Sequence, residues 1–190
     1  MALTHEDILE LFRETDHKFQ ETDRKFQETG RLLKEESRQT ADRIAAVSKA
    51  IGELGGRLGD FVESAVRPAA VRLFRERGIA MHEVHQNVSS QRGDEGIEVD
   101  LLVVNDTDVV GIECKSRLSI EDVDEHLERL EKLKRLLPSY AGKRLLGAVA
   151  AMVIPDDVAK YAYRRGLFVI AQTGEHLTIR NDTRFQPRSW

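Results

Sequence analysis

The chain has 190 residues, of which 41% are hydrophobic and 33% are charged, and its formal net charge is −4 with an isoelectric point near 5.9. This length fits one globular domain and an additional segment. The acidic balance argues against a protein that coats nucleic acid non-specifically, because such proteins are usually basic. It does not exclude an enzyme that holds phosphates through a divalent metal ion.

The cysteine count and the hydropathy of the chain restrict its location. Cys114 is the only cysteine, so an internal disulfide is excluded and no oxidising compartment is needed. The first seven residues carry no basic flank and no apolar run, so no signal peptide is expected. No apolar stretch approaches the roughly 20 residues of a membrane helix. We therefore expect a cytoplasmic protein that makes no use of a membrane.

Residues 1–51 contain a seven-residue repeat that begins at Phe12, Phe19 and Phe26 and reads FRETDHK, FQETDRK and FQETGRL. The apolar phase continues at every seventh position, and a second apolar series joins it later at spacings of three and four. This pattern is typical of a coiled-coil seam. A helix over residues 8–65 would be about 85 Å long, so we expect a homo-oligomer formed through it. A single amphipathic helix that lies on its own domain is the alternative.

Four glycines between residues 52 and 59 separate the repeat from the rest of the chain. Each costs about 1 kcal/mol inside a helix, so the cluster indicates either close helix packing or a flexible joint. We place the domain boundary here, with a coiled-coil oligomerisation helix over 1–51 and a globular domain over 52–190. The helix should resume, be kinked or briefly interrupted at Pro68, and end near Gly78.

Beyond residue 79 the sequence predicts alternating strands and helices. A strand over 79–88 and a polar loop over 89–96 precede two strands, 97–104 and 109–115, that are joined by a turn. The later elements are a helix over 119–137 with Ser119 as its N-cap, a buried strand over 145–154, a short helix between Pro155 and Gly166, a buried strand over 167–171 and a short strand after 176. This order predicts an α/β fold in which helices flank a mixed sheet.

The charged residues of the central hairpin form the candidate site. If its turn is centred in residues 105–108, Asp100 faces Glu113 and Glu98 faces Lys115, and all four project from one face of the sheet. The opposite face then reads as a core face, made of Ile97, Val99, Leu101, Val103, Val110, Ile112 and Cys114.

Two carboxylates that face each other repel and destabilise a hairpin, and a cation between them removes that repulsion. Asp100 and Glu113, completed by water and phosphate, suit Mg²⁺ or Mn²⁺. Lys115 on the same strand can stabilise charge on the phosphate or activate the attacking water. The alternative is a solvated face on which a Glu98–Lys115 ion pair offsets the repulsion, and geometry alone does not choose between the two.

An Asp followed about a dozen residues later by Glu-X-Lys on the adjacent strand, here Asp100 with Glu113 and Lys115, resembles the PD-(D/E)XK nuclease superfamily. The segments GDFVE (59–63), GAVA (147–150) and YAYRRGL (161–167) are similar to an uncharacterised prokaryotic branch of it that carries N-terminal coiled-coil repeats. The resemblance covers about residues 50–190. It departs from the family pattern at Val99, where the motif has proline, and in the next helix, which lacks the Gln-x-x-x-Tyr signature of RecB-like nucleases.

The resemblance implies a restriction-endonuclease-like core and metal-dependent hydrolysis of a nucleic-acid phosphodiester. Asp100 and Glu113 would bind Mg²⁺ or Mn²⁺, and Lys115 would act at the transition state. The superfamily often adds an acidic residue from the first core helix, which would be Glu63; a solvated helix residue is its alternative. His126 is expected to be solvated on the polar side of its helix.

We therefore expect a metal-dependent nuclease that acts on DNA as a coiled-coil oligomer. The alternative is a catalytically silent nuclease-fold protein that binds partners or serves as a scaffold on its coiled coil. The acidic net charge favours the silent protein. The intact set of Asp100, Glu113 and Lys115 favours the enzyme, since a fold without turnover has no reason to keep opposed carboxylates.

Overall fold

The computed structural model describes residues 5–174 and 176–190. Residues 1–4, which belong to the segment in which no signal peptide is expected, lie outside the described residues. The described elements are α1 (His5–Glu76), β1 (Glu83–Arg92), β2 (Glu95–Val104), β3 (Asp108–Arg117), α2 (Ile120–Leu136), a 3-10 turn (Pro138–Tyr140), β4 (Arg144–Val153), α3 (Asp156–Arg164), β5 (Phe168–Thr173) and β6 (His176–Ile179).

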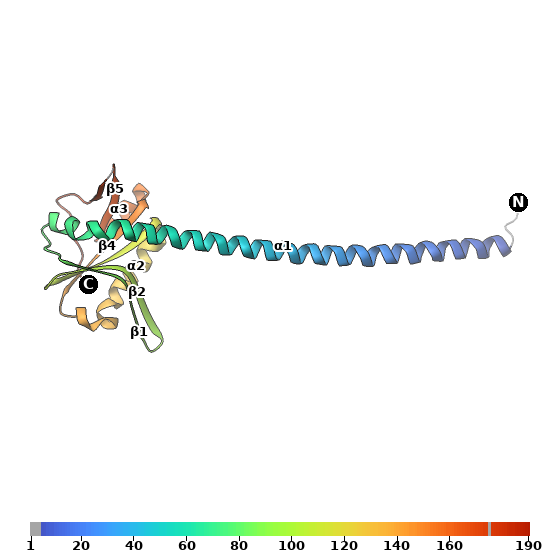
Figure 1. The fold of residues 1–190 in the computed structure, drawn as a ribbon, viewed down its shortest axis with the longest axis horizontal. Coiled ribbons are helices and arrows are strands. Elements are labelled where there is room, and N and C mark those ends of the chain that lie inside the picture. The colour runs from blue at the N-terminus through green and yellow to red at the C-terminus, as the bar shows by residue number, and fades with distance from the viewer. Residues whose placement is uncertain (1–4, 175) are drawn as a thin grey trace. The chain divides into compact units, whose positions relative to one another are not determined.

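The chain divides into two units, residues up to Glu53 and residues Leu54–Trp190, and α1 contributes to both (Figure 1). In the first unit α1 carries the apolar repeat with its side chains exposed, for example Phe19 at 72% and Ile51 at 65%. The helix predicted over 8–65 is thus confirmed. Its apolar stripe has no cover within the described part of this chain.

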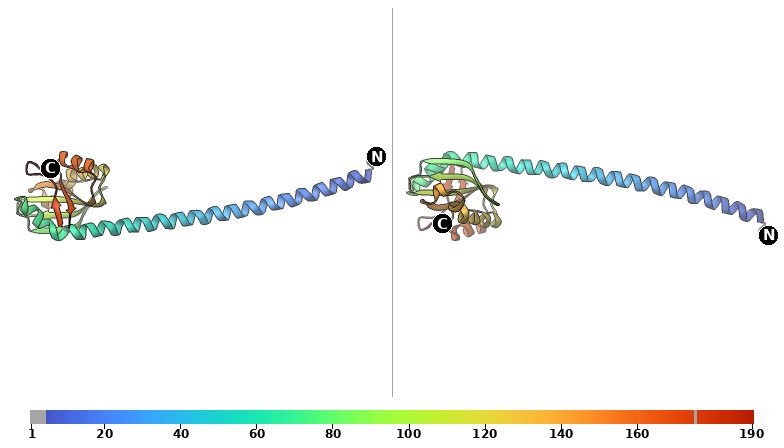
Figure 2. Two further views of the ribbon diagram at one scale, coloured as in Figure 1. Left: turned by 90° about the horizontal axis from the view of Figure 1, so that it is seen from above. Right: turned by 90° about the horizontal axis from the view of Figure 1, so that it is seen from below.

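The second unit is built around a six-stranded sheet in the order β1-β2-β3-β4-β5-β6. The first three strands are antiparallel, β3, β4 and β5 are parallel, and β6 returns antiparallel. The connections β3-α2-β4 and β4-α3-β5 place α2 and α3 on one face, and the last turns of α1 cover the other (Figure 2). The predicted α/β fold, a mixed sheet flanked by helices and preceded by a long helix, is confirmed.

Most predicted elements agree with the structure, and three details do not. The strand predicted over 79–88 begins at Glu83, so residues 79–82 lie outside it. The segment 89–96, predicted as a loop, extends β1 and β2 around a two-residue turn in which Gly93 has a φ of +61°. This hairpin end is largely exposed, so its strands carry polar side chains and lack the apolar alternation that marks a strand. Pro68 does not interrupt α1. It is exposed, so water can bond the backbone carbonyl that proline leaves without a donor.

Helix α2 is set by local signals at its N-terminus. Ser119 and Asp122 form a capping box, in which the Ser119 hydroxyl accepts from the Asp122 N–H and the Asp122 carboxylate accepts from the Ser119 N–H. Pro138 follows the last helical turn, as predicted. Among the described residues, no helix combines the length and the hydropathy needed to cross a bilayer.

Candidate active site

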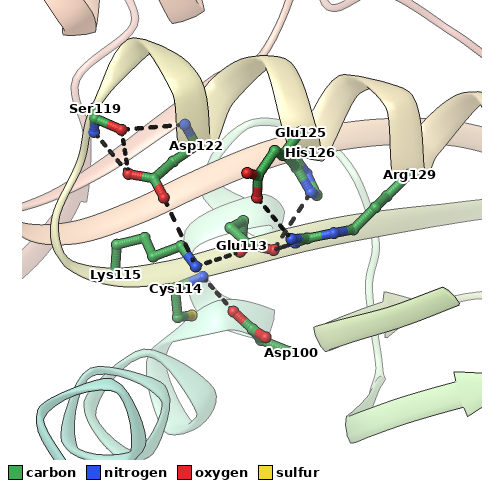
Figure 3. Close-up of polar contacts among 9 residues, drawn as sticks. All are labelled: Asp100, Glu113, Cys114, Lys115, Ser119, Asp122, Glu125, His126 and Arg129. Carbon is green, nitrogen blue, oxygen red and sulfur yellow. Dashed lines mark hydrogen bonds and ion pairs between the residues drawn. The ribbon is translucent and has the colours of Figure 1, made fainter. Parts of the chain in front are cut away.

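The register of the β2–β3 hairpin is the one that its sequence predicts. Leu101 pairs with Ile112 and Val104 with Val109, so a continuation would pair Asp100 with Glu113. The described pairing stops one residue before that point. There the Oδ2 atom of Asp100 accepts a hydrogen bond of 2.7 Å from the backbone N–H of Cys114 (Figure 3). The two strands therefore separate where the motif begins, and the Asp100 side chain bridges the gap.

The predicted division of β2 into one core face and one charged face is wrong. Ile97 and Val99 pack with α2, whereas Leu101 and Val103 pack with α1. The odd-numbered side chains of β2 therefore lie on opposite faces of the sheet before and after Asp100. Helices cover both faces of the sheet, so both faces contribute to the core. Of the four charged side chains, Glu113 is buried, Asp100 and Lys115 are half-buried, and Glu98 is exposed.

Glu113 is the most enclosed carboxylate of the site, with 2% of its side chain exposed. Its Oε1 accepts from Lys115 Nζ at 2.9 Å, and its Oε2 accepts from the guanidinium of Arg129 on α2. Burial by itself would raise the pKa of Glu113, but the hydrogen bonds from Arg129 and Lys115 hold it below its ordinary value. Glu113 is therefore ionised, and its negative charge is offset by two cationic partners.

For Asp100 the effects on the carboxylate pKa sum to a shift in the opposite direction. Burial, and next the negative charge of Glu113, raise the pKa of Asp100 from 3.8 to about 6, although the Cys114 N–H and Lys115 oppose the shift. The side of the site that holds Asp100 is thus short of positive charge. A cation placed there would lower the pKa of Asp100 and relieve its repulsion with Glu113.

Asp100 opens into a hollow of about 290 Å³, here called the site hollow. Its walls are Gly55, Gly56, Gly59, Asp60, Glu63, Asp100, Cys114, Lys115 and Ser116. A Cβ atom added at any of the three glycines would meet no atom within 4 Å, so they leave the hollow open and do not serve close packing within the chain. Glu63 is half-buried, and burial followed by the charge of Asp100 raises its pKa. Glu63 is therefore not a fully solvated helix residue, which was the alternative to a place in the site.

The structure brings Glu63, Asp100, Glu113 and Lys115 together and leaves Glu98 apart. Lys115 contacts Glu113 and lies 3.8 Å from the carboxylate of Asp122, so the alternative Glu98–Lys115 ion pair is absent among the described contacts. Glu98 instead lines a second hollow of about 470 Å³, here called the hairpin hollow, with Ser89, Ser90, Gln91, Gly96, Ile97 and Arg129.

His126 was expected in solvent and is fully buried. Its Nε2–H donates to the backbone carbonyl of Gly111 on β3 at 3.2 Å. Its Nδ1 lies 3.8 Å from Glu113 Oε2 and has no hydrogen-bond partner in the structure. Burial lowers the pKa of His126 to about 4, so the ring is neutral at physiological pH.

The site residues that sequence reasoning missed all come from α2. Asp122, His126 and Arg129 share one side of that helix at spacings of four and three (Figure 3). This spacing, next to the apolar stripe of α2, was the sequence signal that these three side chains lie on one side of the helix. It does not reveal which strand the side chains approach, because that depends on how the helix packs across the sheet.

The donor atoms of the site suit a hard divalent cation. Asp100 and Glu113 offer carboxylate oxygens, and Mg²⁺ typically uses one or two carboxylates with waters and phosphate. The described residues contain no group of three or more His, Cys, Asp or Glu side chains placed to hold a metal ion. An ion held by Asp100 and Glu113 would therefore need further ligands from outside this pair.

Comparisons with known proteins give only distant similarities. No family model matches the chain, and no curated protein matches it. Among solved structures, it is similar to the protein of unknown function AF1548 at 20% identity, with a TM-score of 0.40 and coverage of 54% of each chain. It is also similar to a repair endonuclease from Pyrococcus abyssi at 20% identity and a TM-score of 0.36, over 55% of this chain and 44% of that one. The chain thus spans about half the length of the structures it matches.

Proposed function

We propose that this protein is a metal-dependent nuclease that hydrolyses phosphodiester bonds of DNA. The observation that carries the proposal is the meeting of Asp100, Glu113 and Lys115 where β2 and β3 separate, with Glu63 beside them on the wall of the site hollow. Two carboxylates and a lysine at the point where two strands separate suit the hydrolysis of a phosphodiester.

Each side chain has a distinct role in this proposal. Asp100 and Glu113 would hold the ion, and a bound Mg²⁺ or Mn²⁺ supplies a polarised water and neutralises phosphate charge. Burial acts to lower the pKa of Lys115, but its contact with Glu113 holds that pKa above its ordinary value. Lys115 therefore stays protonated and donates to a phosphate oxygen. Glu63, whose pKa is raised, would accept a proton from the attacking water.

A catalytically silent scaffold is the second candidate, and one observation favours it. Both oxygens of Glu113 already accept from cations, Lys115 on one side and Arg129 on the other. A fold that had lost turnover would use such a pair of contacts to keep a buried carboxylate neutralised. The raised pKa of Asp100 is the argument against it, because a purely structural network has no reason to leave that carboxylate without a cation.

We also propose that the protein is a homo-oligomer assembled through residues 8–65. The support is the heptad repeat together with the exposure of its apolar members, from Phe12 at 71% to Leu54 at 59%. A helix of this length with a polar outer surface is stabilised when a second helix of the same period covers the seam.

Calorimetric titration with Mg²⁺ and Mn²⁺ tests the function. The wild type should bind, Asp100→Asn with Glu113→Gln should not, and Glu128→Gln on the exposed side of α2 should bind like the wild type. DNA cleavage in Mg²⁺ that disappears in Lys115→Met and Asp100→Asn would complete the case. Absence of metal binding in the wild type, with and without a DNA oligonucleotide, would leave the scaffold as the better reading.

A further inference from the structure

Arg129 has a place in the site that the proposed roles leave unexplained. It reaches Glu113 from α2 while 29% of its side chain stays exposed, and its second nitrogen lies 3.3 Å from Glu125 Oε2 (Figure 3). The same side chain lines the hairpin hollow beside Ser89 and Glu98. Arg129 thus stands between a buried carboxylate on one side and an open polar hollow on the other.

The contacts of Glu113 as they stand disfavour a metal ion at this carboxylate. Its Oε1 accepts from Lys115 and its Oε2 accepts from Arg129, so neither oxygen is free of a cationic donor. A divalent ion shared with Asp100 needs one of these oxygens. It would also lie close to a guanidinium, and the two positive charges repel in a partly buried setting. The ion therefore binds more favourably when one of the two cationic partners moves away.

Arg129 is the partner that can move. Lys115 stays beside Glu113 because both lie on β3, and it has Asp122 as a further neighbour. Arg129 has an alternative acceptor in Glu125, which is 64% exposed, and it faces the hairpin hollow. A guanidinium also forms paired hydrogen bonds with phosphate, which makes a nucleic-acid backbone a strong competitor for it.

We propose that Arg129 is a latch on Glu113: it occupies that carboxylate in the substrate-free protein and releases it when it takes a phosphate of the nucleic acid. The proposal rests on the proposed nuclease function. Its consequence is that metal and nucleic acid promote each other's binding, because each favours the position of Arg129 that the other needs, and such coupling is reciprocal. Arg129 is then a positioning residue that weakens metal binding until substrate is present.

The test compares Mn²⁺ binding by the full chain and two charge-matched variants. Arg129→Gln removes the latch, and Arg135→Gln removes one positive charge from the same helix, where it contacts the exposed Glu95. We expect Arg129→Gln to bind Mn²⁺ about tenfold more tightly than the wild type and Arg135→Gln to stay within about twofold, in the range of typical coupling between sites. Arg129→Lys keeps the charge without the paired donors and serves if the Gln variant does not fold.

A second titration contains a phosphorothioate oligonucleotide, which resists hydrolysis. It should tighten Mn²⁺ binding to the wild type about tenfold and to Arg129→Gln by less than about threefold, because the coupling passes through Arg129. Equal tightening in both proteins, or weaker metal binding in Arg129→Gln, overturns the latch and leaves the metal site standing. Absence of binding in every variant, with or without the oligonucleotide, overturns the latch and the proposed function together.

Discussion

The carboxylate of Asp100 on β2 accepts a 2.7 Å hydrogen bond from the backbone N–H of Cys114 on β3. Cys114 lies between Glu113 and Lys115, so this one contact fixes Asp100 to the strand that carries the other two motif residues. Cys114 itself is buried, and burial raises the pKa of its thiol, so it is inert packing. Of the two candidate metal ligands, Asp100 is thereby held by a backbone donor, whereas Glu113 is held by the side chains of Lys115 and Arg129.

Asp100 should destabilise the metal-free fold at neutral pH. Its folded pKa of about 6 exceeds its ordinary value of 3.8, so the folded state keeps a proton that the unfolded state has lost. Stability should therefore fall as the pH rises from about 4 to 6. Asp100→Asn, which retains the acceptor for Cys114, should be more stable than the wild type by about 1–2 kcal/mol at pH 7.5, after allowance for solvent screening.

Urea unfolding in the presence of a chelator measures this difference. Asp94→Asn, at the exposed tip of the β1–β2 hairpin, is the matched control and should unfold like the wild type. The gain in Asp100→Asn should vanish near pH 3.5, where both states are protonated. A variant that is less stable than the wild type at pH 7.5 would mean that Asp100 is satisfied without a cation.

His126 should produce a pH dependence of the opposite sign. Its folded pKa of about 4 lies below the ordinary value of 6.5, so the unfolded state gains a proton first as the pH falls. The stability due to the neutral ring is complete above pH 6.5 and is lost between 6.5 and 4, by on the order of 3 kcal/mol.

The measurement is urea unfolding from pH 7.5 to 4 in an Asp100→Asn background, which removes the competing carboxylate. His126→Gln, which can still donate to the Gly111 carbonyl, should flatten the curve in this range. His85→Gln, at an exposed position of β1, should leave it unchanged. An unaltered slope in the His126 variant would contradict the neutral, buried ring.

Glu113→Gln should weaken the fold because it leaves two partly buried cations, Lys115 and Arg129, without their shared carboxylate. Breaking a buried ion pair from one side typically costs about 3–5 kcal/mol, and the partial exposure of both cations places the expected loss at about 2–3 kcal/mol. Glu125→Gln, which removes the exposed partner of the same arginine, should change the unfolding free energy within experimental error. Equal effects of the two substitutions would show that the ion pairs of Glu113 contribute little to the unfolding free energy.

The elements that the sequence predicts well are those specified by local signals. Helix α2 has its capping Ser119, its apolar stripe and Pro138 within one segment, so its bounds follow without knowledge of the rest of the fold. The hairpin register likewise follows from one turn, and it brings Asp100 near Glu113. The polar end of β1 carries no such signal, because an exposed hairpin does not need apolar alternation.

The environment of the site depends on packing and could not be predicted from spacing. The position of α2 across β3 decides that Arg129 reaches Glu113 and that His126 is buried with its ring hydrogen-bonded to the Gly111 carbonyl. Likewise, the change of face in β2 at Asp100 arises because the strands separate there, which alternation in the sequence does not disclose. The motif residues were therefore identifiable, whereas their counter-ions were not.

Gly166 should tolerate alanine much less well than Gly174. Both glycines have a positive φ, +82° and +61°, which costs a residue with a side chain about 1–2 kcal/mol. A Cβ at Gly166 would in addition lie 2.8 Å from the backbone nitrogen of Arg188, whereas one at Gly174 would meet nothing within 4 Å. Gly166→Ala should lose at least about 2 kcal/mol more, as overpacking does elsewhere. Similar melting temperatures for the two variants would contradict the close approach of the C-terminal segment.

Self-association through α1 should depend on the apolar seam and not on the outer surface of the helix. Val47 is a seam residue with 58% of its side chain exposed, and Ala45 is a neighbour on the far side of the same helix. Val47→Glu should shift the assembly towards the 21.6 kDa monomer in sedimentation velocity, whereas Ala45→Glu should sediment like the wild type.

Circular dichroism provides a second readout for the same pair of variants. An isolated helix without a packing partner is marginal in water, so loss of association should reduce the helical signal of Val47→Glu below that of Ala45→Glu. A wild type that sediments as a monomer at about 100 µM while it keeps its full helical signal would contradict the oligomer, since α1 would then be stable without a second copy on its seam.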